Sequence, residues 1–157
     1  MWTKSAAMAL AVAAAQPADP ASAIPESLRA HIRAETFSPL ASVSALPAAV
    51  QTELARLFGT KSLDLADPGA PFQATDVVTN PRLPWRRLIS AGCAADHCLV
   101  HYEKGGFAHL YQVVVLSRQG EAVRFAWGGA VAGPMPNVQA VRDTVASGKA
   151  LGQTKYW

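Results

Sequence analysis

The sequence predicts one α+β domain over residues 24–157, built from a four-stranded antiparallel β-meander with helices packed on one face. Three observations lead to this fold class. Four runs rich in β-branched and aromatic residues follow one another closely, glycine-containing connections join them, and amphipathic segments with helical spacing stand on either side. The chain of 157 residues is long enough for one domain with its own hydrophobic core.

The amino-terminal residues have the composition of a targeting segment. Lys4 precedes the apolar run 6–15, and alanines at cleavage spacing follow. This is the layout of a secretory signal peptide, and the run is too short to cross a bilayer. We expect residues 1–23 to be a signal peptide and leader, with cleavage after Ala15 or Ala23 and no membrane anchor. The protein is then periplasmic or secreted.

Three segments are expected to be helices. Residues 25–34 and 44–58 each place apolar side chains three and four positions apart, which puts those side chains on one helix face. Residues 138–147 do the same, after Asn137 as a favourable N-cap and before Gly148 as a favourable helix end.

The connection 61–84 contains several prolines and is expected to be a long surface loop, with one short strand at residues 74–78. Loops of this length are uncommon unless they are ordered for a purpose. This one is expected to wrap the sheet or to form the rim of a cleft.

Four strands are predicted from their β-branched and aromatic residues, at 85–93, 98–104, 107–117 and 121–127. Short connections between them favour an antiparallel meander, at residues 94–97, 105–106 and 119–120. Glycine in the last two connections supplies the positive φ of tight hairpin turns.

The two glycine turns set the expected pairing of the strands. The first places His101 opposite Leu110, and the second places Leu116 opposite Val123. One face then carries mostly apolar residues and is the expected core: Leu99, His101, Leu110, Val114, Leu116, Val123, Phe125 and Trp127. The other face is mixed, and is either partly covered or a binding surface: Val100, Tyr102, His109, Tyr111, Val113, Val115 and Arg124.

The sharpest local feature is a pair of cysteines, Cys93 and Cys98, that flank a short loop between two predicted strands. Opposed strand positions can bring two Cβ atoms within disulfide distance. A signal peptide directs the chain to an oxidising compartment, where such pairs form bridges. We therefore expect a structural disulfide, worth about 2 kcal/mol because its loop is short.

A metal site is the competing interpretation of the same region, because thiol and imidazole ligands gather there: Cys93, His97, Cys98, His101 and His109. Their spacing matches no zinc motif, and the expected register puts two of the histidines on opposite faces. No metal and no cofactor is therefore expected.

Catalytic candidates surround the predicted turn at residues 105–106. His101, Glu103 and His109 could act in general acid–base chemistry if they lined a pocket. The chain has no nucleophile elbow, zinc-protease motif, phosphate-binding loop or dinucleotide fingerprint. An enzyme is therefore not the first expectation.

Binding candidates lie on the mixed face of the sheet: Tyr102, His109, Tyr111 and Arg124. Tyrosine and arginine dominate the energetics of many protein interfaces, because they bury large areas at low entropic cost. This face is the expected binding surface unless a loop or a chain end covers it.

The net charge of +3 is mildly basic. Arg82, Arg86 and Arg87 stand close together around Trp85, but nucleic-acid footprints show denser clusters of cations. We expect this group to be a solvated strand entry and expect no nucleic-acid partner.

One segment resembles a known group of sequences. The run Cys-Leu-Val-His-Tyr-Glu-Lys-Gly-Gly at 98–106, followed by Ala108-His109 and by Arg-Phe-Ala-Trp-Gly-Gly at 124–129, resembles uncharacterised exported bacterial proteins. The resemblance covers about residues 88–129. It implies a bacterial periplasmic location and no particular activity.

The function expected from the sequence is that of a small exported binding protein, similar in kind to inhibitor or immunity proteins, with another protein of the cell envelope as its partner. The first alternative is a small cell-envelope hydrolase using His101, Glu103 or His109. The second is a metal-binding protein.

Overall fold

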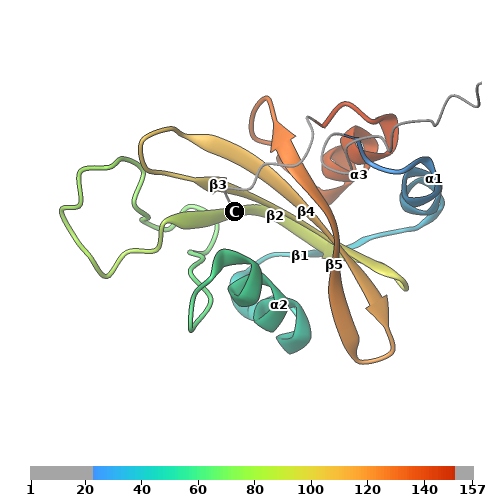
Figure 1. The fold of residues 1–157 in the computed structure, drawn as a ribbon, viewed down its shortest axis with the longest axis horizontal. Helices are drawn as coiled ribbons and strands as arrows, with labels where there is room; N and C mark the ends of the chain where they lie inside the picture. Colours follow the sequence, from blue (N-terminus) through green and yellow to red (C-terminus); the bar gives the residue numbers. More distant parts are fainter. Residues whose placement is uncertain (1–22, 151–157) are drawn as a thin grey trace, which may run out of the picture.

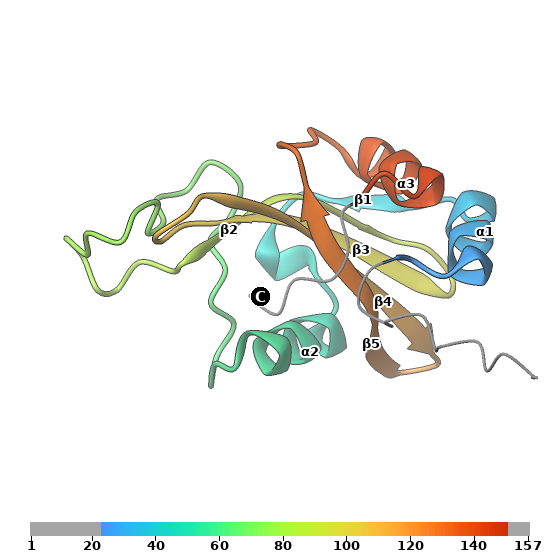
Figure 2. The same cartoon turned by 45° about the horizontal axis from the view of Figure 1, so that its top comes forward.

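Five strands form one antiparallel sheet with helices on both of its faces (Figures 1 and 2). This computed structural model describes residues 23–150, so the expected signal peptide and the last residues of the chain lie outside the described residues. The α+β class and the antiparallel meander are confirmed. Within the described residues no helix is long and apolar enough to span a bilayer.

The sheet has the order β1-β2-β3-β4-β5, and its strands are Ser38–Leu40, Arg86–Cys93, His97–Lys104, Leu110–Gln119 and Ala122–Val131. The four predicted strands are present. The expected count of four is wrong, because β1 pairs with the end of β2, with Ser38 opposite Cys93. A strand this short with a proline at its centre has no alternating pattern by which a sequence could reveal it.

The helices are α1 (Glu26–Ala34), α2 (Ala48–Phe58) and α3 (Val138–Ser147). The predicted helix at 44–58 begins later, because Pro47 is the N-cap and a 3₁₀ turn, η1 (Val43–Ala45), precedes it. The α3 helix is capped as expected, with the Ala140 amide donating to Asn137 Oδ1 at 2.9 Å. Gly148, with φ of 71°, ends it.

The expectation of helices on one face is wrong. α1 and α3 pack on one face of the sheet, and α2 packs on the other (Figure 2). Core residues on the α3 side include Ile32, Leu99, Val113, Val115, Trp127, Val141 and Val145. Core residues on the α2 side include Val50, Leu54, Leu88, Val100, Tyr102, Val114 and Leu116. The sheet therefore has no solvent-facing side at its centre.

The expected register of β3 and β4 is wrong, because the connection between them spans residues 105–109. Lys104 pairs with Leu110, and His101 pairs with Val113. The observed pairing differs from the expected one by an odd number of residues. Because side chains alternate between the two faces of a strand, the β4 residues expected on one face of β3 lie on the other. Leu99 thus shares a face with Val115, and not with Val114.

The register of the β4–β5 hairpin also differs from the expected one. Near the turn the difference is an even number of residues, so the side chains keep their expected faces there. Gln119 pairs with Ala122, and Leu116 pairs with Phe125 instead of with Val123. A bulge follows, because Val115 pairs with Trp127 and leaves Ala126 as the extra residue.

An α2 side chain also bonds to the backbone of β5. The Phe125 amide donates to Glu53 Oε1 at 2.8 Å. Arg56 holds the same carboxylate through two bonds of 2.7 Å, and this pairing lowers the pKa of Glu53 although burial opposes the shift.

The long connection between α2 and β2 wraps the outer edge of β2, as expected, but contains no strand at 74–78. Ala66 forms a parallel bridge with Arg87. Its amide donates to Arg86 O, and its carbonyl accepts from the Leu88 amide, each at 2.9 Å. This connection and β1 therefore divide the outer edge of β2 between them.

Candidate functional site

The expected disulfide is present at the end of the β2–β3 hairpin. Cys93 and Cys98 are bonded and stand opposite each other in the register, with Cα atoms 4.1 Å apart. We call residues 93–98 the clamped loop. In Figure 1 the hairpin that carries it lies at the end of the sheet away from the long connection.

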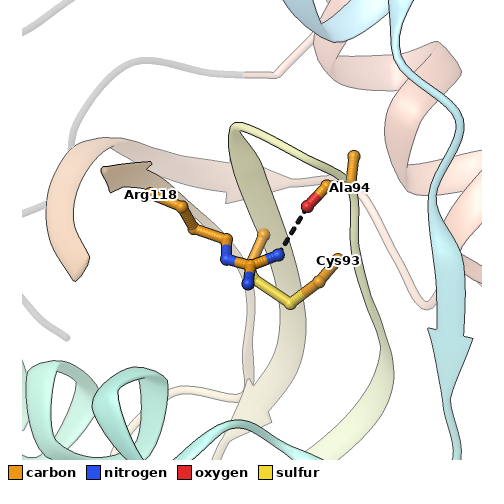
Figure 3. Close-up of a disulfide and its surroundings, with 4 residues drawn as sticks. Cys93, Ala94 and Arg118 are labelled. Carbon is orange, nitrogen blue, oxygen red and sulfur yellow. Dashed lines mark hydrogen bonds between the residues drawn. A yellow bond between two sulfur atoms is a disulfide. The ribbon is translucent and has the colours of Figure 1, made fainter. Parts of the chain in front are cut away.

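Hydrogen bonds fix the backbone of the clamped loop in addition to the disulfide. The Ala94 amide donates to His97 O at 2.8 Å. Arg118 of β4 bonds to the loop twice, through its amide to Asp96 O at 2.7 Å and through Nη1 to Ala94 O at 2.6 Å. Figure 3 shows the second bond, with the guanidinium beside the disulfide. These bonds restrain both sides of the turn.

The base of the clamped loop is tied to the first helix. The His97 side chain is only 8% exposed, and its Nδ1 hydrogen-bonds to Glu35, the residue that follows α1. His31 of α1 places its ring 6.1 Å from the His97 ring. The loop is thus held by three separate parts of the chain: its own hairpin, β4 and the end of α1.

The tip of the clamped loop points its side chains at solvent. Ala95 and Asp96 are exposed, and no described residue hydrogen-bonds to the Asp96 carboxylate. The result is a narrow convex turn with a fixed backbone and one charged group. A fixed turn of this shape can fit a concave surface with little loss of conformational entropy.

A second polar cluster lies on the α3 side, at the opposite end of β2 and β3. The Glu103 carboxylate is 8% exposed and accepts from Arg87 Nε at 2.7 Å and from His109 Nε2 at 2.6 Å. Tyr111 stacks on the His109 ring with centroids 5.0 Å apart, and Phe72 lies 4.4 Å under the Arg87 guanidinium. Two of the three catalytic candidates, Glu103 and His109, therefore meet.

The third catalytic candidate, His101, is a buried structural histidine. Its Nδ1 donates to Gln112 O at 2.8 Å, and its Nε2 accepts from the Met135 amide at 3.0 Å. Ser90 Oγ donates to Met135 O at 3.0 Å, so the two side chains together fix the segment before α3. Both ring nitrogens are occupied, which leaves His101 no free atom for proton transfer.

Acid should weaken the fold through His101. Burial lowers its pKa, although the bond to Gln112 and the nearby Glu103 carboxylate oppose the shift. As the pH falls, His101 of the unfolded chain takes up a proton near pH 6.5, whereas His101 of the folded chain does so only at a lower pH. The contribution of His101 to the free energy of unfolding is therefore complete above pH 6.5. Below that pH it falls by up to about 1.4 kcal/mol per pH unit, until the pKa of the folded state is reached.

Urea unfolding between pH 8 and pH 5 measures this effect, and His101→Gln isolates it from the other histidines. The variant should lose stability at pH 8 and show a shallower decline toward pH 5 than the wild type. Parallel declines in the two proteins would show that another group is responsible.

The expected binding face does not exist as one surface. Tyr102 is 0% exposed because α2 covers its face of the sheet, and the observed register puts Tyr111 on the opposite face. Arg124 is exposed, but it pairs with Ser117. Ser117 lies about 20 Å along β4 from Tyr111, so Arg124 and Tyr111 are far apart. Only His109 and Tyr111 of the four binding candidates lie together.

The basic group and the metal candidates are also separated. Arg86 and Arg87 are adjacent strand residues and point to opposite faces, where Arg86 pairs with Asp64 and Arg87 with Glu103. Within residues 23–150 no group of three or more His, Cys, Asp or Glu side chains is placed to hold a metal ion. The two cysteines of the candidate ligand set form the disulfide instead.

Sequence reasoning missed Arg118, Glu35 and the exposed tip of the clamped loop. The cysteine pair was the one local signal that pointed to this region. No protein-family model, curated protein or solved structure compared with the chain matches it. The resemblance of segment 98–106 to exported bacterial proteins stays a prediction, and function is argued from the geometry alone.

Proposed function

We propose that the chain is an exported, inhibitor-like binding protein that inserts its clamped loop into a concave site on another protein of the cell envelope. The observation that carries the proposal is the fixed backbone of residues 93–98, whose exposed tip is held by a disulfide and by Arg118. The apolar run 6–15, typical of a signal peptide, and the disulfide support an oxidising compartment as its place of action.

A fixed loop favours tight binding for a thermodynamic reason. Association must offset the conformational entropy of every segment that becomes ordered at the interface. The clamped loop is ordered before any partner arrives, so little of the interaction energy is lost on ordering it. Complexes of inhibitors with enzymes commonly form in this way, with small backbone changes between free and bound states.

The tip also indicates the chemistry of the partner site. Asp96 is its one charged side chain, and its carboxylate has no partner among the described residues. Burial of an unpaired carboxylate at an interface would be unfavourable. The partner is therefore expected to present a cation or several N–H or O–H donors inside its cleft.

The test begins with the mature protein as bait in a cell-envelope extract, with captured proteins identified by mass spectrometry. Affinity for the captured partner is then measured by calorimetry for the wild type and for Ala95→Arg and Asp96→Asn. Both substitutions lie at the exposed tip, so the fold should be unchanged. We expect each to weaken binding by about tenfold or more, as loss of a central interface contact does.

Asp76→Asn is the matched control, because Asp76 is an exposed loop carboxylate on the long connection. It should bind as the wild type does. A variant with Cys93→Ser and Cys98→Ser should remain folded and bind more weakly. Unchanged affinity in Ala95→Arg and Asp96→Asn would show that the partner binds elsewhere.

A hydrolase remains the second candidate because of one observation. The Glu103–His109 hydrogen bond of 2.6 Å lies beside a solvent-open cavity that Glu103 lines. A carboxylate can orient an imidazole for general base catalysis with water. Hydrolysis of envelope-derived esters or glycans that disappears in His109→Gln would favour this function over binding alone.

A further inference from the structure

A cavity of about 350 Å³ opens on the α3 side of the sheet, at the end opposite the clamped loop. Three parts of the chain form it: the long connection, the strands β2 to β4 and the segment before α3. The residues that matter for its chemistry are Pro68, Gly69, Arg87, Ile89, Tyr111 and Pro134, with Glu103 at its floor. Its volume lies in the range of sites for small ligands.

The walls of the cavity are fixed by hydrogen bonds rather than left to mobile loops. Arg87 Nη1 donates to Ala70 O at 3.2 Å, which holds the wall that carries Pro68 and Gly69. Ser90 and His101 bind the two backbone groups of Met135, and so hold the wall that carries Pro134. The cavity is therefore preformed.

Two residues that line the cavity carry a hydrogen-bond donor with no partner among the described residues. Arg87 uses Nε for Glu103 and Nη1 for Ala70, and its Nη2 bonds to no described residue, although the side chain is 28% exposed. Tyr111 is half-buried, and its hydroxyl likewise bonds to no described residue. The remaining wall is apolar, from two prolines and Ile89.

The negative charge of Glu103 at the floor of the cavity is balanced by Arg87. Glu103 alone would repel an anion, but both of its oxygens already accept hydrogen bonds, from Arg87 and His109. The guanidinium stays planar and fixed over the Phe72 ring, 4.4 Å from its centroid. A fixed guanidinium recognises planar carboxylates better than a flexible ammonium does.

We propose that this cavity binds a carboxylate that carries a small apolar group, with the carboxylate on Arg87 Nη2 and the Tyr111 hydroxyl and the apolar group against Ile89, Pro68 and Pro134. The ligand is either a free organic acid or the carboxyl end of a peptide, since both present the same chemistry. This site is separate from the clamped loop.

The proposal is tested by NMR titration of the ¹⁵N-labelled mature protein with 3-phenylpropionate, and with its neutral amide as the chemical control. A peptide that ends in leucine, with a free or an amidated carboxyl end, distinguishes the two sources. Binding of either free acid, with saturable shifts at residues 69–70, 87–89 and 111 and at least tenfold weaker binding of the matching amide, supports the proposal. Equal binding of acid and amide, or no saturable shift with either acid, overturns it.

Variants locate the contact. Tyr111→Phe removes only the hydroxyl and should weaken acid binding several-fold with no loss of stability. Arg87→Gln should weaken it by about tenfold or more, as loss of a charged hydrogen bond does. Arg82→Gln, an exposed arginine outside the cavity, is the control. If Tyr111→Phe and Arg87→Gln both bind the acid with wild-type affinity, the carboxylate does not bind at these two residues and the proposal is overturned. If Arg87→Gln does not fold, the result for Tyr111→Phe alone decides.

Discussion

Tyr102→Ala should lower the free energy of unfolding by about 3–5 kcal/mol, the range for truncation of a buried aromatic side chain. Tyr102 is 0% exposed and packs edge-on against the Phe58 ring of α2, with centroids 5.2 Å apart. Its removal leaves a cavity between the sheet and α2. Burial raises the pKa of its hydroxyl, so the group stays protonated and neutral in the core.

Tyr111→Ala is the matched comparison, because Tyr111 is a half-buried tyrosine at the start of β4, on the other side of the sheet. It should lose clearly less stability than Tyr102→Ala in urea unfolding followed by circular dichroism. In the sequence-based register both tyrosines lie on one surface, so truncation of either would cost a similar amount of stability. Equal losses would therefore contradict the register of β3 and β4 described above.

Gly105→Ala should destabilise the fold by about 3 kcal/mol or more, at the upper end of overpacking effects. A Cβ at Gly105 would lie 1.8 Å from Gln73 O and 2.7 Å from backbone atoms of Ala74. These are backbone atoms, so no side-chain rotation relieves the clash. The long connection would have to leave the β3–β4 loop, and the Gly105 amide would lose its bond of 3.0 Å to Trp85 O.

Gly133→Ala is the control for this substitution, since its Cβ would meet nothing within 4 Å and its φ is not positive. Its stability should stay within about 0.5 kcal/mol of the wild type. Thermal unfolding compares the two variants, and limited proteolysis shows whether residues 74–84 become accessible in Gly105→Ala. Equal melting temperatures would contradict the close packing of the two loops.

The strands were predictable because their residue types are local signals, but the register was not. The connection after Lys104 looks like a two-residue turn, since two glycines follow one another. Gly105 in fact lies under Gln73, and the turn begins later. That contact joins residues far apart in the chain, so no local rule reveals it. A register error of an odd number of residues was enough to place Tyr102 and Tyr111 on one face, although they lie on opposite faces.

The sequence of β3 does indicate that both faces of the sheet are covered, although the sequence-based register assumes an alternating pattern for it. Leu99 and Val100 are consecutive apolar residues, and every residue of β3 except the last is buried. Continuous apolar runs indicate strands covered on both faces. The candidate site was predictable only at its cysteines. Its other contacts join residues far apart in the chain, so no local pattern reveals them. Arg118 is 24 residues from Ala94, and Glu35 is 62 residues from His97.

The bond between Glu53 and the Phe125 amide bears on self-association. An edge strand offers its backbone groups as a template for strands of other molecules, and aggregation follows where that template is long and flat. In β5 a carboxylate already occupies the Phe125 amide, and the extra residue Ala126 breaks the register immediately afterwards. An incoming strand thus meets a bound amide and a kink at the middle of β5. Among residues 23–150 no strand pairs with this edge, and the two features oppose growth into fibres there.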